Sequence, residues 1–154
     1  LQVRVYHPRN NATESDGAIV YLHGGGFVFG DPEMFEGLTR TLARMMSTRL
    51  LVSVDYRLAP ETVFPGAIED CERVLEYIIK NGPSMYGIDP RKIVVMGDSA
   101  GGNLAAVLSQ RRRENKAEPK ILGQVLLYPF LQLSDMQTYS YRQHNREQDG
   151  LALV

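Results

Sequence analysis

The chain of 154 residues is long enough for one domain with a buried core, and a composition of 44% hydrophobic and 23% charged residues is that of an ordinary globular protein. A formal net charge of −1 gives no electrostatic reason to expect nucleic acid as a partner. The single cysteine, Cys71, leaves no internal disulfide to form, and we expect it on a helix face in the core. No Cys or His spacing predicts a metal site.

Segments with the periodicity of strands alternate with segments of helical periodicity along residues 1–154, which we take as one domain. This alternation predicts an α/β fold with a mostly parallel sheet and helices on its faces. The expected elements are strand 1–8, strand 18–23, helix 34–48, strand 50–56, helix 67–81, strand 92–96, helix 102–113 and strand 121–129.

Local signals set several details of these helices. Gly82 and Pro83 are expected to stop the helix over 67–81, and Asp89 before Pro90 to cap a single turn. The buried stripe of the helix over 34–48 is expected at Phe35, Leu38, Leu42 and Met45.

Two polar segments lie toward the end of the chain. The cations at 111–113 fall in the last turn of a helix, where the helix dipole favours them, so we expect a solvated helix end, with a lipid or partner contact as the alternative. From Ser134 onward the sequence is polar and has no clear period. It is expected to be a loop, or the beginning of an element that the chain does not complete.

Residues 97–101, Gly-Asp-Ser-Ala-Gly, match the pattern G-x-S-x-G between a predicted strand and a predicted helix. In that context the turn from strand to helix is so sharp that Ser99 adopts a strained backbone conformation. Only small residues at the two glycine positions avoid a steric clash with the serine. The alternative is a tight turn whose serine only caps the helix. A phosphate-binding loop is excluded, because Asn103 and Leu104 stand where lysine and a hydroxyl residue are needed.

A second motif, His23-Gly24-Gly25-Gly26-Phe27, follows a buried strand upstream of the serine. An acyl-transfer enzyme of this architecture needs backbone N–H groups there, facing the substrate carbonyl, and glycine lets the backbone approach closely. With the N–H of Ala100 they would form an oxyanion hole. His23 is expected to support the loop by hydrogen bonds rather than to act as a base.

Together, the motifs HGGGF, YRLAPE at 56–61 and GDSAGGN resemble the hormone-sensitive-lipase branch of the α/β-hydrolases. The continuation ILGQVLLYPFLQ with SYRQHN is similar to its arylacetamide deacetylase and neutral cholesterol ester hydrolase group. The resemblance implies an ester hydrolase without a cofactor, acting on small-molecule or lipid esters, with Ser99 as nucleophile. It implies oxyanion donors among Gly24, Gly25, Gly26 and Ala100, support of the turn from Gly97, Asp98 and Gly101, and a brace beneath the site from Arg57, Pro60, Glu61 and Asp70.

The base and the orienting carboxylate of a serine hydrolase follow the nucleophile in chain order on later loops, and the resemblance places them beyond this chain. Asp135 and His144 have the right order, but no strand intervenes to return His144 to the site, so we expect both in a solvated loop. The sequence is therefore interpreted as the N-terminal part of an esterase, with little activity of its own and a sheet edge open to self-association. The alternatives are a non-catalytic binding protein on the same fold and a protein that binds lipid surfaces.

Further details depend on the resemblance. Val28 and Phe29 occupy the region where the group often has a cysteine, so that disulfide cannot form. Asn11 begins an N-x-T triplet, either a glycan acceptor or a chance match. The group is usually placed in the lumen of the endoplasmic reticulum and held by an N-terminal membrane anchor, which would lie upstream of Leu1.

Overall fold

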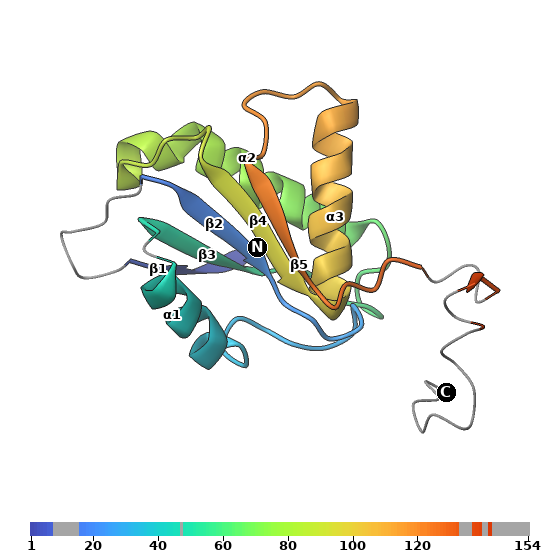
Figure 1. Cartoon of the computed structure of the whole chain (residues 1–154). Helices are drawn as coiled ribbons and strands as arrows, with labels where there is room; N and C mark the ends of the chain where they lie inside the picture. The colour runs from blue at the N-terminus through green and yellow to red at the C-terminus, as the bar shows by residue number, and fades with distance from the viewer. Residues whose placement is uncertain (8–15, 47, 133–136, 140–141, 143–154) are drawn as a thin grey trace.

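A mixed sheet of five strands forms the centre of the molecule (Figure 1). The computed structural model describes residues 1–7, 16–46, 48–132, 137–139 and 142, and orders the strands β1-β3-β2-β4-β5. The strands are β1 (Gln2–Tyr6), β2 (Ala18–Leu22), β3 (Leu50–Asp55), β4 (Ile93–Asp98) and β5 (Gly123–Leu127). The helices are α1 (Glu36–Met45), α2 (Gly66–Tyr86) and α3 (Ser99–Glu114).

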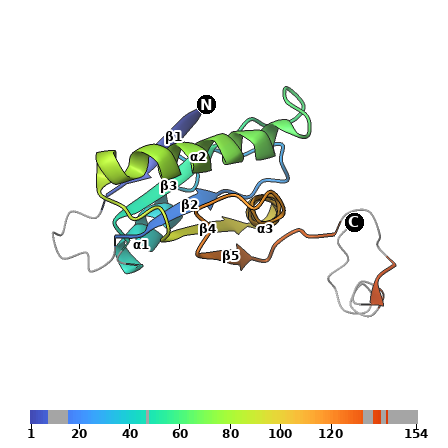
Figure 2. The same ribbon diagram turned by 90° about the horizontal axis from the view of Figure 1, so that it is seen from above.

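Helices cover both faces of this sheet, as Figure 2 shows. Strand β1 runs antiparallel to β3, and the other neighbouring strands are parallel. Side chains alternate between the faces of a strand, so Val20 packs in the core shared with α2 and α3, while Ile19 and Tyr21 pack toward α1. The predicted α/β fold, with a mostly parallel sheet between helices, is confirmed.

The buried face of α1 differs from the predicted stripe. Leu38 and Met45 are exposed, and the residues buried against the sheet are Thr39 and Ala43. The Thr39 hydroxyl donates to the Phe35 carbonyl at 3.0 Å, which satisfies that polar group inside the interface. Phe35 and Leu42, the other two residues of the predicted stripe, are partly buried and pack against the same cluster as Ala43. The prediction is therefore right for Phe35 and Leu42 and wrong for Leu38 and Met45.

The prediction that Gly82 and Pro83 stop a helix is wrong. Helix α2 continues through both to Tyr86 and ends at Gly87, whose φ of +67° is the left-handed conformation typical of a helix end. Gly82 instead lets the Ile88 side chain pack closely on α2, since a Cβ there would lie 2.6 Å from Cδ1 of Ile88.

Other local predictions have mixed outcomes. Cys71 is fully buried on α2, as predicted. Asp89 holds a short turn, its carboxylate accepting from the Arg91 N–H at 2.9 Å. The expected solvated end of α3 is wrong for Arg112, of which only 6% is exposed. Asn11, Asp135 and His144 lie outside the described residues.

The unpaired sides of β1 and β5 are the edges of the sheet as far as the structure describes it. Self-association through such an edge stays a prediction. No helix within the described ranges combines the length and the apolar character that crossing a membrane requires.

Candidate active site

Ser99 lies at the carboxyl end of β4, where the strand turns directly into α3. Its φ of +49° is a conformation that residues with side chains rarely adopt, and the helix begins at Ser99 itself, three residues earlier than the sequence predicts. Gly97 and Gly101 flank the turn: a Cβ on Gly97 would overlap the carbonyl of Gly101, and one on Gly101 would overlap that of Leu22. The chain can therefore make this turn only with glycine at both positions.

The segment after β5 lies against the start of α3. The Phe130 N–H donates to the Ser99 carbonyl at 3.0 Å, and the Asn103 amide donates to the Phe130 carbonyl at 2.7 Å. Ala100 is in the first turn of α3, where amide groups have no acceptor within the helix and the dipole is positive. A developing negative charge beside Ser99 would be stabilised there.

The glycine-rich loop follows β2, the neighbour of β4 in the sheet. Gly25 and Gly26 have φ values of +125° and +62°, which glycine adopts without strain. The Gly25 carbonyl accepts from the N–H groups of Val28 and Phe29, both at 3.1 Å, which closes the loop into a tight turn. Because β2 and β4 are parallel neighbours, this loop and Ser99 both lie at the carboxyl ends of the strands.

Asp98 links the loop to the serine turn. This buried carboxylate accepts from the Tyr21 hydroxyl at 2.5 Å and from the Gly24 N–H at 3.0 Å through the same oxygen. Burial and the neighbouring carboxylate both raise the pKa of Tyr21, which keeps its hydroxyl a donor. Since the Gly24 N–H is occupied, Gly24 is removed from the candidate oxyanion donors, which leaves Gly25, Gly26 and Ala100.

His23 lies beneath the loop, fully buried and stacked on Tyr56 with ring centroids 4.3 Å apart. Its Nδ1–H donates to the Gly24 carbonyl at 2.7 Å, and the Tyr56 hydroxyl donates to the His23 carbonyl at 2.6 Å. Burial lowers the pKa of His23, so the ring is neutral at pH 7. These contacts are those of a residue that supports the loop, and the supporting role of His23 stays a prediction. The roles of Tyr21 and Tyr56 were not predicted, since each is separated from its partner by tens of residues.

We expect the free energy of unfolding to fall as the pH is lowered from 7 to 5, partly because of His23. Above the unfolded-state pKa of about 6.5, His23 is neutral in both the folded and the unfolded chain, so the folded state carries no penalty. As the pH falls from 6.5 through the lower folded-state pKa, the unfolded chain takes up the proton more readily, and the free energy of unfolding decreases by up to about 1.4 kcal/mol per pH unit. Urea unfolding at pH 7, 6 and 5 measures it. In His23→Asn the decline should be shallower, and parallel declines in both proteins would contradict this role.

The loop after β3 braces the glycine-rich loop from outside. Arg57 makes a two-pronged contact with the buried Asp70, with Nε and Nη2 donating at 2.7 and 2.9 Å. Burial would raise the pKa of Asp70, but the hydrogen bonds from Arg57 outweigh it and lower that pKa. The Ala59 N–H next to Pro60 then donates to the Phe27 carbonyl at 2.9 Å. Glu61, predicted in the same brace, is exposed.

Within the described ranges, no side chain hydrogen-bonds the Ser99 hydroxyl. Among the same residues, no three His, Cys, Asp or Glu side chains gather where a metal ion could be held. The structure thus brings together the turn, the glycine-rich loop and its supports. The candidate pair of Asp135 and His144 lies outside what it describes.

Comparison with known proteins assigns the family. Residues 19–153 match the model of a family described as alpha/beta hydrolase fold. The chain is 40% identical to human arylacetamide deacetylase-like 2 over 148 residues, covering 94% of this chain and 37% of that protein. It is 35% identical to bovine neutral cholesterol ester hydrolase 1, covering 94% of this chain and 36% of the relative.

A solved hyperthermophilic esterase from the archaeon Pyrobaculum calidifontis superposes with a TM-score of 0.83 at 41% identity, over 96% of this chain and 47% of the esterase. The chain thus spans less than half the length of these relatives. The matches confirm the resemblance drawn from the HGGGF and GDSAGGN motifs. The chain belongs to the alpha/beta hydrolase family, in the branch that includes the arylacetamide deacetylases and neutral cholesterol ester hydrolases.

Proposed function

We propose that this chain carries the nucleophile and the oxyanion hole of a serine carboxylic-ester hydrolase acting on small-molecule or lipid esters. The observation that carries the proposal is the conformation of Ser99: a positive φ between two glycines that cannot be replaced, at the edge of the sheet where the glycine-rich loop also lies. A turn that only capped α3 would not need such a strained residue. The names of the esterases and deacetylases that the chain resembles agree with this chemistry.

In the proposed reaction, Ser99 Oγ attacks the ester carbonyl while a general base takes its proton. The negative charge on the carbonyl oxygen is stabilised by the N–H groups of Gly25, Gly26 and Ala100, each worth on the order of 3 kcal/mol in the transition state. The alcohol then leaves with a proton and the acyl group remains on Ser99. Water cleaves this acyl-enzyme, which releases the carboxylic acid and restores the hydroxyl.

The alternative is a non-catalytic binding protein on the same fold, and one observation agrees with both candidates: among the described residues, no side chain hydrogen-bonds the Ser99 hydroxyl. Without its base, a serine hydrolase loses several orders of magnitude in rate. Both candidates therefore predict weak hydrolysis of p-nitrophenyl butyrate by the chain alone, and the discriminating property is the reactivity of Ser99.

The test is labelling of the folded chain by excess fluorophosphonate, with imidazole added as an external base. We expect slow labelling that imidazole accelerates, that disappears in Ser99→Ala and that persists in Ser109→Ala, whose hydroxyl is bonded to the Ala105 carbonyl within α3. A folded chain that stays unlabelled, or that is labelled equally in Ser99→Ala, would overturn the hydrolase proposal in favour of the binding protein.

A further inference from the structure

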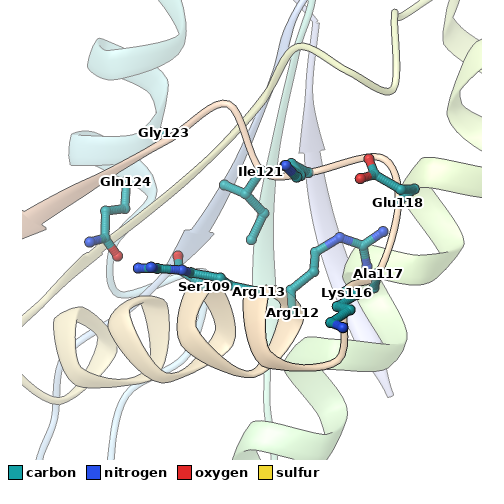
Figure 3. Close-up of a pocket in the computed structure, with 10 residues that line it drawn as sticks. Ser109, Arg112, Arg113, Lys116, Ala117, Glu118, Ile121, Gly123 and Gln124 are labelled. Carbon is teal, nitrogen blue, oxygen red and sulfur yellow. The ribbon is translucent and has the colours of Figure 1, made fainter.

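Figure 3 shows the lining of a cavity of about 550 Å³. The cavity lies at the C-terminal end of α3, opposite to the end that Ser99 begins. Its walls are the last turns of α3, the connection that follows and the start of β5. The lining includes Arg112, Arg113, Lys116, Glu118, Lys120 and Ile121. None of these belongs to the candidate active site.

Arg112 is the buried charge of this cavity, with 6% of its surface exposed. Its Nε donates to the Pro119 carbonyl at 2.8 Å and its Nη1 to the carboxylate of Glu76, whose side chain is 62% exposed. Its Nη2 is buried and has no acceptor among the described residues. Arginine keeps its charge when buried, and a buried N–H without an acceptor lowers stability. A ligand atom that accepts a hydrogen bond from Nη2 of Arg112 would therefore be bound favourably.

The rim of the cavity carries an excess of positive charge. Arg113, Lys116 and Lys120 are exposed, and none of the three is ion-paired within the described ranges. Glu118 is the one carboxylate among the lining residues. At the carbonyl end of α3, the Arg112 carbonyl accepts from the Ala117 N–H and the Arg113 carbonyl from the Lys116 N–H, both at 3.1 Å, so these two carbonyls are already hydrogen-bonded.

The remaining wall is apolar. Ile121 is half-buried and Ala117 lines the same space, together with the aliphatic stems of the basic side chains. A Cβ placed on Gly123 would meet nothing within 4 Å, so the cavity is open beside β5. Its volume lies in the range of about 300–1,000 Å³ that is usual for sites of small organic ligands.

We propose that this cavity binds an organic oxyanion, a carboxylate or a phosphate monoester, with its charged group against Nη2 of Arg112 and its apolar part over Ile121. The guanidinium supplies the buried donor, while Lys116 and Lys120 supply attraction at the rim. A hydrogen bond from a guanidinium N–H to an oxyanion is charge-assisted, and therefore stronger than one between neutral groups. This inference does not depend on the hydrolase proposal, since it uses none of the residues around Ser99.

The test is calorimetric titration of the chain with octanoate below its micellar concentration, beside inorganic phosphate, octyl phosphate and 1-octanol. We expect octanoate or octyl phosphate to bind, and the tighter of the two identifies the natural headgroup as carboxylate or phosphate ester. Inorganic phosphate lacks the apolar part and 1-octanol the charge, so both should bind at least several-fold more weakly. Equal binding of 1-octanol or of inorganic phosphate would overturn the proposal.

Variants at exposed positions test the same site without disturbing the fold. The double change Lys116→Gln with Lys120→Gln should weaken octanoate binding on the order of tenfold, whereas Glu118→Gln should tighten it, because a like charge is removed. Arg44→Gln, in the last turn of α1, is the matched control and should change nothing. Binding that is unaffected by the double lysine change would contradict the assignment.

Arg112→Met removes the buried donor and keeps most of the apolar volume. It should abolish binding of octanoate if the chain folds, which circular dichroism checks. Should this variant fail to fold, the lysine and Glu118 variants still decide the question.

Discussion

Gly101→Ala is expected to destabilise the chain by roughly 3 kcal/mol or more, a large share of the stability of a domain of this size. The added methyl group would overlap the carbonyl oxygens of both Leu22 and His23. These are backbone atoms in and next to β2, so no side-chain rotation can relieve the overlap. Either α3 moves away from the sheet or the strand shifts, and both disrupt the core.

Urea unfolding of the wild-type and variant chains measures this effect, and Gly37→Ala is its control. Gly37 lies in α1, where a Cβ would meet nothing within 4 Å. Alanine there should raise the free energy of unfolding by about 0.5–1 kcal/mol, since glycine is unfavourable inside a helix. A Gly101→Ala chain that unfolds at the wild-type urea concentration would show that α3 does not approach β2 this closely.

The features that could be predicted from the sequence are those that short segments determine by themselves. The apolar run at 18–22 has the length of a buried strand. The glycines on either side of Ser99 identify the sharp turn in the sequence, and the same glycines make that turn sterically possible. The order of strands and helices along the chain then follows from periodicity. Each of these inferences needs only neighbouring residues.

Prediction failed where the deciding contact comes from a residue outside the short segment that carries the local signal. Gly82 would end a helix on its own, but Ile88 packs against it and α2 continues. Arg112 is typical of a solvated helix end, yet the chain folds back over it and Pro119 accepts its hydrogen bond. The contact between Asp98 and Tyr21 joins residues 77 positions apart, and no local pattern reveals it.

Asp98→Ala is the second change with a large expected effect, a loss of about 2–6 kcal/mol in the free energy of unfolding. The variant leaves the Tyr21 hydroxyl and the Gly24 N–H buried without their acceptor, and each such group costs about 1–3 kcal/mol. Tyr21→Phe is the matched control. It removes the Tyr21 hydroxyl but keeps the hydrogen bond from the Gly24 N–H to Asp98, so the free energy of unfolding should fall by only about 1 kcal/mol.

The two variants also separate stability from the position of the glycine-rich loop. Hydrogen exchange at the Gly24 amide should accelerate strongly in Asp98→Ala and little in Tyr21→Phe, because only the first frees that amide. If the loop supplies the oxyanion donors, fluorophosphonate labelling of Ser99 should fall in the same order. Equal exchange in both variants would mean that the loop is held by the stack of His23 on Tyr56 and not by the carboxylate that precedes the serine.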